Sequence, residues 1–264
     1  CDWRTFAAES ICAHVRRRAE VIRAHSGVPV MAHAWGGGTV LCPDLGAMAF
    51  DDWKQAEVVD VWGCSGFPRT LPEVVSLGLS LDSTRSAAAG RPFWQAELGA
   101  GDLGSGLDRA GRVPPEWLAL WSWESVRHGV KGLLYWQFRK ERQGSELGAY
   151  GLTDYAGEAT PNAVAAAAVG ASLNRHAEAF LAAVPEPAQV ALLFSYQSRM
   201  VDWAQHRHCR LSRSALAGYY HLFWQCSTPV DILHDERLDA AVLSRYRLVI
   251  LPMPVCLAAG VEAV

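Results

Sequence analysis

The hydrophobic pattern alternates between helix-like and strand-like stretches. Apolar residues three or four positions apart predict helices, and short apolar runs that end at glycine or proline predict buried strands. The predicted strands of the first 183 residues are 28–34, 58–62, 93–97 and 132–138, and the predicted helices are 3–25, 52–57, 71–89, 114–129 and 160–183. Helix followed by strand, four times over, indicates parallel βα units.

Four parallel βα units are half of an eight-stranded (β/α)8 TIM barrel. The chain has no initiator methionine and opens within a predicted helix. We therefore expect a fragment in which residues 1–184 form the C-terminal half of a TIM barrel. A doubly wound open sheet is the rival fold, but no glycine-rich phosphate fingerprint follows any of these strands.

A second α/β unit is predicted after the linker Pro185-Glu-Pro187. The predicted strands are 189–194, 229–233 and 247–252, and the predicted helix is 214–225. This βαβ pattern predicts a partial flavodoxin-like (amidotransferase-like) α/β domain over 188–264. Cys256 follows its last strand, but Val255 and Leu257 replace the glycines of a nucleophile elbow, so we expect an inert buried thiol.

Composition excludes several classes of protein. A net charge of −3 gives no reason to expect nucleic acid or a membrane surface as a partner, and no apolar run approaches the roughly 20 residues of a membrane span. The seven cysteines are scattered without zinc-ligand spacing, so we expect no metal, no cofactor and reduced thiols in the cytoplasm. The eleven tryptophans favour aromatic surfaces on which sugar rings lie.

Glu97 is the strongest catalytic candidate. It ends the predicted strand 93–97, and the C-terminal tips of parallel strands are where barrels hold their chemistry. Retaining glycoside hydrolysis uses two carboxyl groups about 5 Å apart, and Glu97 suits the nucleophile. A solvated strand-end glutamate is the structural alternative. The glycines that follow, which predict a loop without onward pairing, are Gly99, Gly101, Gly104 and Gly106.

Four motifs occur in an order that resembles glycoside hydrolase family 42, the β-galactosidases of the cellulase-like barrel superfamily. They are Asp2-Trp3 with the arginine-rich helix, Trp53 with Glu57-Val-Val-Asp-Val-Trp-Gly63, Pro92-Phe-Trp-Gln-Ala-Glu97, and Leu134-Tyr-Trp-Gln-Phe-Arg139 with Gly144-Ser-Glu146. The resemblance covers nearly the whole chain. It implies a retaining enzyme that cleaves terminal β-D-galactosides or oligosaccharides, and a second domain similar to the family's trimerisation domain, hence a homotrimer.

The resemblance also assigns residues. Glu97 matches the family's nucleophile, and Glu146 matches a glutamate that binds galactose hydroxyls, although a surface glutamate is the alternative. Three positions depart from the family: Phe67 replaces a tyrosine that can hydrogen-bond the nucleophile, Ala149 replaces a histidine, and Ser105 replaces a tryptophan. The choice of substrate within the family is therefore open.

Further side chains at strand ends complete the expected site. His33 is placed to donate to a sugar hydroxyl, with a core histidine as the alternative. Of Trp35, Trp62 and Trp136, we expect one to be a stacking platform and the others to fill the core. The predicted substrate-binding residues are Glu146, Phe67, His33, Trp35 and Trp136.

The family's acid/base glutamate is not found in this sequence. It follows an asparagine at the end of the fourth barrel strand, and the two asparagines here, Asn162 and Asn174, do not precede glutamate. We therefore expect the 264-residue piece alone to hydrolyse nothing. A non-catalytic carbohydrate-binding or assembly protein of the same fold, and a related glycosidase such as an α-L-arabinopyranosidase, are the alternatives.

Overall fold

The computed structural model describes residues 2–35, 38–42, 51–105 and 108–263. The helices are α1 (Asp2–His25), α2 (Gly38–Leu41), α3 (Asp52–Ala56), α4 (Val74–Ala88), α5 (Pro115–Arg127), α6 (Pro161–Arg175), α7 (Ala177–Ala182), α8 (Tyr196–His206), α9 (Arg210–Gln225) and α10 (Ala240–Leu243). The strands are β1 (Met31–Ala34), β2 (Val61–Gly66), β3 (Phe93–Gly99), β4 (Leu103–Ser105), β5 (Asp108–Gly111), β6 (Gly132–Trp136), β7 (Val190–Phe194), β8 (Val230–His234) and β9 (Leu248–Ile250). Short 3₁₀ turns are η1 (Leu71–Glu73), η2 (Asp235–Arg237) and η3 (Val261–Ala263).

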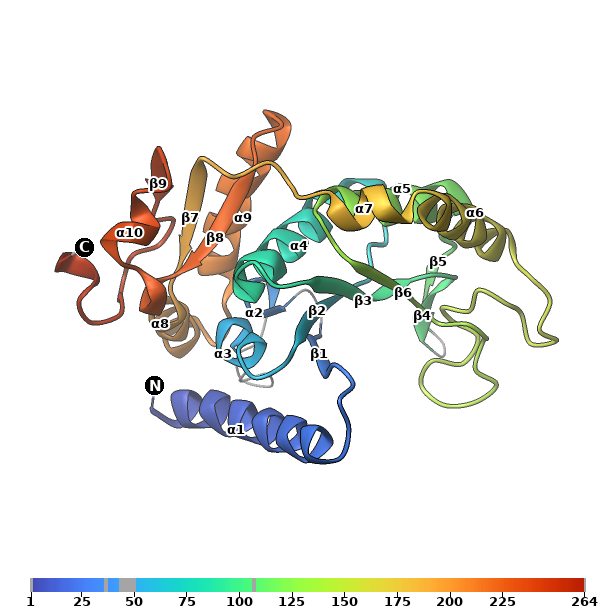
Figure 1. The fold of residues 1–264 in the computed structure, drawn as a ribbon, viewed down its shortest axis with the longest axis horizontal. Coiled ribbons are helices and arrows are strands. Elements are labelled where there is room, and N and C mark those ends of the chain that lie inside the picture. Colours follow the sequence, from blue (N-terminus) through green and yellow to red (C-terminus); the bar gives the residue numbers. More distant parts are fainter. Residues whose placement is uncertain (1, 36–37, 43–50, 106–107, 264) are drawn as a thin grey trace.

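The first sheet contains the four predicted strands in the order β1-β2-β3-β6, and every pairing is parallel. The helices α4, α5 and α6 lie along one side of this sheet, while α1 lies beyond β1 and packs against α3 (Figure 1). The prediction of parallel βα units is therefore confirmed. Because parallel strands share one carboxyl edge, the segments that follow β1, β2, β3 and β6 meet there.

The second sheet is also parallel, with the order β8-β7-β9. Its central strand β7 is buried at every position, as expected for a strand with neighbours on both sides. The helix α8 beside it was not predicted. Several of its buried residues are polar, among them Arg199 and Asp202, so its buried face is not marked by apolar residues alone. Ser195 caps it by accepting a hydrogen bond from the Ser198 amide at 3.1 Å.

Two local predictions differ from the structure. The expected single helix over 160–183 is divided at His176, whose backbone leaves the helical region at φ −118°, and no glycine or proline marks the break. The chain after Glu97 continues in β3 to Gly99 and then pairs again in the antiparallel hairpin β4–β5. The expectation of a loop without onward pairing was therefore wrong; Gly106 lies outside the described residues.

Helix α4 also contacts the second part of the chain. Asp82 of α4 lies 2.8 Å from His128 Nδ1 and accepts a 2.6 Å hydrogen bond from the Tyr220 hydroxyl of α9. Glu124 of α5 lies 3.2 Å from His128 Nε2, and the His128 ring stacks on Trp224 with centroids 5.7 Å apart. We call these five side chains the α4–α5–α9 junction.

Charges in this junction stabilise one another. Burial opposes ionisation of Asp82 and Glu124, but their hydrogen bonds and opposite charges prevail, so the pKa of Asp82 is lowered and that of Glu124 falls to about 2. Burial likewise lowers the pKa of His128, yet the two carboxylates raise it by more. The two carboxylates therefore favour the protonated form of the buried His128 ring that lies between them.

Candidate active site

A bulge in β3 sets the direction of Glu97. Cys64 of β2 pairs with Gln95, whereas Ser65 pairs with Glu97, so Ala96 is an extra residue. In a regular strand Glu97 would share a face with Gln95, which is fully buried and accepts from the Cys64 thiol at 3.2 Å. The extra residue reverses the alternation, and Glu97 instead lines a pocket at the carboxyl edge of the sheet.

Gln95 stabilises this bulge from the opposite face of the sheet. Its side-chain amide donates to the main-chain carbonyl of Glu97 at 2.8 Å. A Cβ on Gly66 would meet that amide at 2.9 Å and Leu77 of α4 at 2.7 Å, which places Gln95 on the face of the sheet covered by α4. The support of Glu97 therefore comes from the helical side, and sequence analysis did not find it.

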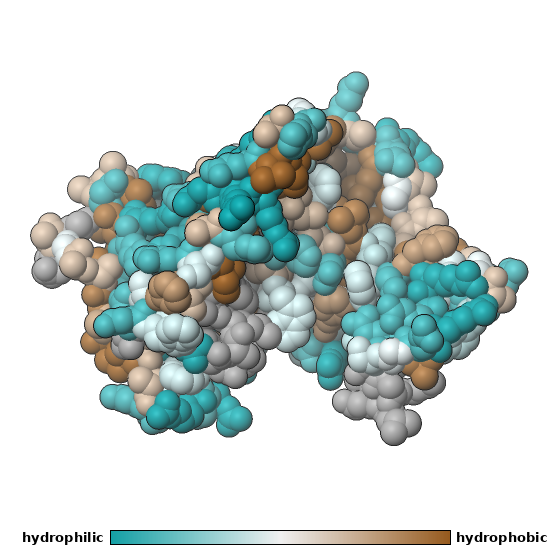
Figure 2. Space-filling model, turned by 90° about the horizontal axis from the view of Figure 1, so that it is seen from below, coloured by the Kyte–Doolittle hydropathy of each residue, from teal (hydrophilic) through white to brown (hydrophobic). Residues whose placement is uncertain are grey.

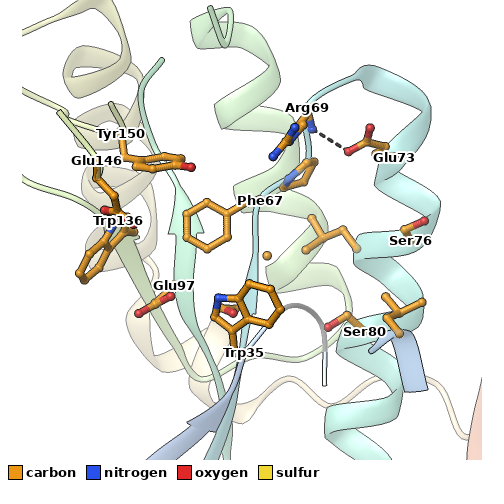
Figure 3. Close-up of a pocket in the computed structure, with 15 residues that line it drawn as sticks. Trp35, Phe67, Arg69, Glu73, Ser76, Ser80, Glu97, Trp136, Glu146 and Tyr150 are labelled. Atoms are coloured by element: carbon orange, nitrogen blue, oxygen red, sulfur yellow. Dashed lines mark hydrogen bonds between the residues drawn. The ribbon is translucent and has the colours of Figure 1, made fainter. Parts of the chain in front are cut away.

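The pocket has a volume of about 510 Å³ and is built from the segments that end or follow β1, β2, β3 and β6. Seen from below, this face is hollowed near its middle, with hydrophobic side chains inside the hollow and hydrophilic ones on both flanks (Figure 2). Five predicted site residues, which reach the pocket from separate segments, line its wall (Figure 3): Trp35, Phe67, Glu97, Trp136 and Glu146. Lining residues that were not predicted include Ser65, Arg69, Glu73 and Tyr150.

Glu97 is partly shielded from water, with 22% of its side chain exposed. Burial raises the pKa of its carboxyl group, the Glu146 charge raises it further, and His33 lowers it. His33 Nε2 lies 3.7 Å from Glu97 Oε1, so the predicted histidine is a charge neighbour of the carboxylate. It is not among the residues that line the pocket.

Trp136 orients the second carboxylate. Its indole N–H donates to Glu146 Oε2 at 2.9 Å, a pairing that joins the end of β6 to the loop beyond it. Trp35 is 57% exposed, whereas Trp62 is only 2% exposed and belongs to the core. That one of the tryptophans is a stacking platform stays a prediction.

The departures at Phe67 and Ala149 change the chemistry of the wall. Phe67 lies edge-on to Tyr150 with ring centroids 5.3 Å apart, and a Cβ on Gly99 would meet its ring at 2.8 Å. Ala149 is buried and leaves the pocket side to its neighbour Tyr150. The wall beside Glu97 is therefore partly aromatic, and Tyr150 adds a phenol hydroxyl group to it.

The described residues contain neither a group of side chains that could hold a metal ion nor a helix that could cross a membrane. No cluster of three or more histidine, cysteine or acidic side chains there is arranged to hold a metal ion. None of the helices within the described ranges is both long and apolar enough to cross a bilayer.

Parallel βα units whose strand ends present two carboxylates to one pocket are typical of barrel glycoside hydrolases. The family model Glyco_hydro_42, described as Beta-galactosidase, matches residues 1–176. The chain belongs to this family.

Individual relatives are more distant. The chain is 24% identical over 263 residues to Beta-galactosidase BglY of Alicyclobacillus acidocaldarius, covering 96% of this chain and 36% of the relative. It is 25% identical over 264 residues to Beta-galactosidase BgaH of Haloferax lucentense, covering 94% of this chain and 36% of the relative. The chain thus spans about a third of the length of these curated relatives.

Solved structures share the fold. A catalytic mutant of Gan42B, a GH42 beta-galactosidase from G. stearothermophilus, superposes with a TM-score of 0.80 at 21% identity, over 95% of this chain and 37% of that one. The beta-galactosidase from Halorubrum lacusprofundi gives 0.77 at 21% identity, over 94% and 37%. The predicted α/β fold with parallel sheets, similar to barrels of this family, is confirmed.

Proposed function

We propose that the protein is a retaining glycoside hydrolase that cleaves terminal β-D-galactosides. The observation that carries this proposal is the bulge at Ala96, which turns Glu97 out of the helical layer and into a pocket that also contains Glu146. Relatives of the chain are named beta-galactosidases, which supports galactosides as the substrate class.

Glu97 is the proposed nucleophile. Its carboxylate attacks the anomeric carbon, the aglycone leaves, and water then hydrolyses the covalent glycosyl–enzyme with net retention. The attacking form is ionised. Burial and the Glu146 charge oppose ionisation, and a positive charge on His33 at 3.7 Å favours it. The opposing effects of burial, Glu146 and His33 therefore determine the pH above which Glu97 is ionised and can attack.

Glu146 is the proposed sugar-binding carboxylate. The hydrogen bond from the Trp136 indole uses Oε2 and fixes the side chain, so Oε1 is presented to the hydroxyls of a bound sugar. Trp35 at the exposed rim supplies a ring face for stacking. Protonation of the leaving oxygen is assigned to a glutamate outside this chain, as the family resemblance implies.

Residues 188–264 are proposed to form part of a flavodoxin-like trimerisation domain, and residues 1–184 to be the partial barrel domain. The separate parallel sheet β8-β7-β9 with α8 and α9 supports this division. A homotrimer and a cytoplasmic location are part of the same proposal. The latter is supported by described cysteines that carry a thiol and no disulfide: Cys12, Cys64, Cys209, Cys226 and Cys256. Cys256 is exposed, so the expectation that it is buried was wrong.

A related glycosidase is the second candidate. The wall beside Glu97 carries Phe67, and Ala149 is buried outside the pocket lining; the family resemblance implies polar side chains at both positions, so contacts to individual sugar hydroxyls differ. An α-L-arabinopyranoside, which has the galactose ring without its hydroxymethyl group, is the substrate that separates the candidates. A non-catalytic binding protein would turn over neither glycoside.

The test uses the complete gene product and Glu97→Ala. We expect 4-nitrophenyl β-D-galactoside turnover to fall on the order of 10³-fold or more, as when a covalent nucleophile is lost. Azide, a small external nucleophile, should restore part of the activity and give the inverted glycosyl azide. The matched control is Glu158→Gln, an exposed carboxylate in the loop after β6, which should behave as wild type. Wild-type rates in Glu97→Ala would contradict the assignment.

A further inference from the structure

Tyr150 has a backbone conformation that bulky residues rarely adopt. Its φ is +57°, in the left-handed region where a side chain crowds the backbone. The other non-glycine residues described with positive φ are Ala89, Arg207 and Ser227, which end or directly follow the C-terminal turns of α4, α8 and α9. Left-handed residues are common at helix ends. Tyr150 lies in a loop, so helix termination does not explain it.

Neighbouring backbone holds Tyr150 in place. Its amide donates to the Asp102 carbonyl at 2.8 Å, and its own carbonyl accepts from the Gln137 amide at 2.8 Å. Gly101 lies so close that a Cβ there would meet the Tyr150 carbonyl carbon at 2.7 Å. The strained residue is thus fixed between the loop after β3 and the loop after β6, the two segments that border Glu97.

The Tyr150 side chain is directed into the pocket. Figure 3 shows its ring extending over Phe67, on the same side of the cavity as Trp136 and Glu146. The edge-on contact with Phe67, at 5.3 Å and 72°, fixes the ring. None of the hydrogen bonds among the described residues uses the Tyr150 hydroxyl. Strain of this kind collects at ligand-binding positions, because surrounding contacts maintain it for a functional contact.

We propose that Tyr150 is a specificity-determining residue that hydrogen-bonds one hydroxyl of the sugar ring bound against Glu97. This rests on the proposed function. Glu97 and Glu146 only accept hydrogen bonds when ionised, and the Trp136 indole N–H is already used by Glu146. A phenol both donates and accepts, so Tyr150 supplies a neutral donor for a sugar hydroxyl beside these carboxylates.

The test compares Tyr150→Phe and Tyr150→Gly with wild type in the complete gene product. The substrates are 4-nitrophenyl β-D-galactoside and its deoxy analogues, each with one ring hydroxyl or the C6 hydroxyl replaced by hydrogen. Tyr150→Phe should lower kcat/KM by about 2- to 12-fold on the parent, the effect of one neutral hydrogen bond. The loss should vanish for the single analogue that lacks the contacted hydroxyl.

Tyr150→Gly removes the whole side chain. Glycine accepts φ +57° without strain, which offsets part of the stability lost with the partly buried ring and its contact with Phe67, and kcat/KM should fall further than in Tyr150→Phe. The control is Tyr155→Phe, a 40% exposed tyrosine in the same loop, which should match wild type. An equal loss on every analogue, or unchanged kcat/KM in Tyr150→Phe on every substrate, would overturn the inference.

The proposed function fails in a different way. A 2-deoxy-2-fluoro-galactosyl fluoride should label Glu97 in wild type and in Tyr150→Phe, as read by peptide mass spectrometry. Absence of the label from wild type would refute the nucleophile, whereas a labelled enzyme with no hydroxyl-specific loss would refute only the role of Tyr150.

Discussion

Gln95 offers a direct test of the β3 bulge. Gln95→Leu keeps nearly the same volume but removes the 2.8 Å bond to the Glu97 carbonyl and the acceptor of the Cys64 thiol at 3.2 Å. Gln95 is fully buried, so water does not replace the lost amide. A buried carbonyl left unpaired costs about 1–3 kcal/mol, and a thiol is too weak a donor to add much. We expect the free energy of unfolding to fall by that amount.

The same change should act on catalysis. Without the amide, β3 is less firmly held in the register that turns Glu97 toward the pocket. We expect kcat to fall more than KM rises, because the nucleophile acts in bond formation while Glu146 and Trp136 still bind the sugar. Urea unfolding, steady-state kinetics on 4-nitrophenyl β-D-galactoside and the rate of Glu97 labelling measure these effects in the complete gene product.

Cys64→Ala is the matched control for Gln95→Leu. It removes the thiol contact but keeps the bond from Gln95 to the Glu97 carbonyl, so kcat should stay near wild type. An unchanged unfolding free energy in Gln95→Leu would show that the bond from Gln95 to the Glu97 carbonyl does not stabilise the fold. A destabilised variant with wild-type kcat and labelling rate would show that Glu97 still points into the pocket without Gln95.

Two further predictions concern charge. Glu146→Gln removes a charge that raises the pKa of Glu97, so the acidic limb of the kcat/KM profile should move to lower pH; an unmoved limb would mean that burial alone sets this pKa. His128→Gln should lower the unfolding free energy by about 1–3 kcal/mol, since Asp82 and Glu124 lose the buried ring that they share and keep Arg85 and Arg127 as charged partners. The pKa of His128 is raised by folding, so its stabilising effect is complete below the ordinary value of 6.5 and is lost as the pH rises through the folded value. Urea titrations across that range should therefore show wild-type stability declining with pH and His128→Gln declining less, and parallel declines would contradict the role of the imidazolium.

Sequence alone located the strands and the residues at their ends because both depend on local pattern. The apolar run before Glu97 and the motif around Trp136 predicted which side chains meet at the carboxyl edge. The bulge was not predictable in this way, since one inserted residue such as Ala96 leaves a short apolar run unchanged. Helix α8 was missed because buried polar side chains, including Arg199, occupy positions where a periodic pattern needs apolar ones.

The pocket residues beyond the strands depend on tertiary contacts. Tyr150 reaches the cavity because the loops after β3 and β6 lie so close at Gly101 that only glycine fits there. No local pattern in either loop encodes this approach. The bond between Trp136 and Glu146 likewise follows from the path of a ten-residue segment. The expected residues were found because each lies within a recognisable motif, while the supporting residues lie outside one.

Helix α4 is shared between the catalytic pocket and the second half of the molecule. Ser76 and Ser80 line the cavity. On the same helix, a Cβ at Gly78 would meet the Trp224 ring of α9 at 2.3 Å, so no side chain fits at position 78 while Trp224 stays in place. Replacing the C-terminal unit of this protein with an unrelated one would therefore require new side chains on the helix that also lines the pocket. The two units cannot be exchanged independently, because a change in the packing of α4 also changes the wall of the cavity.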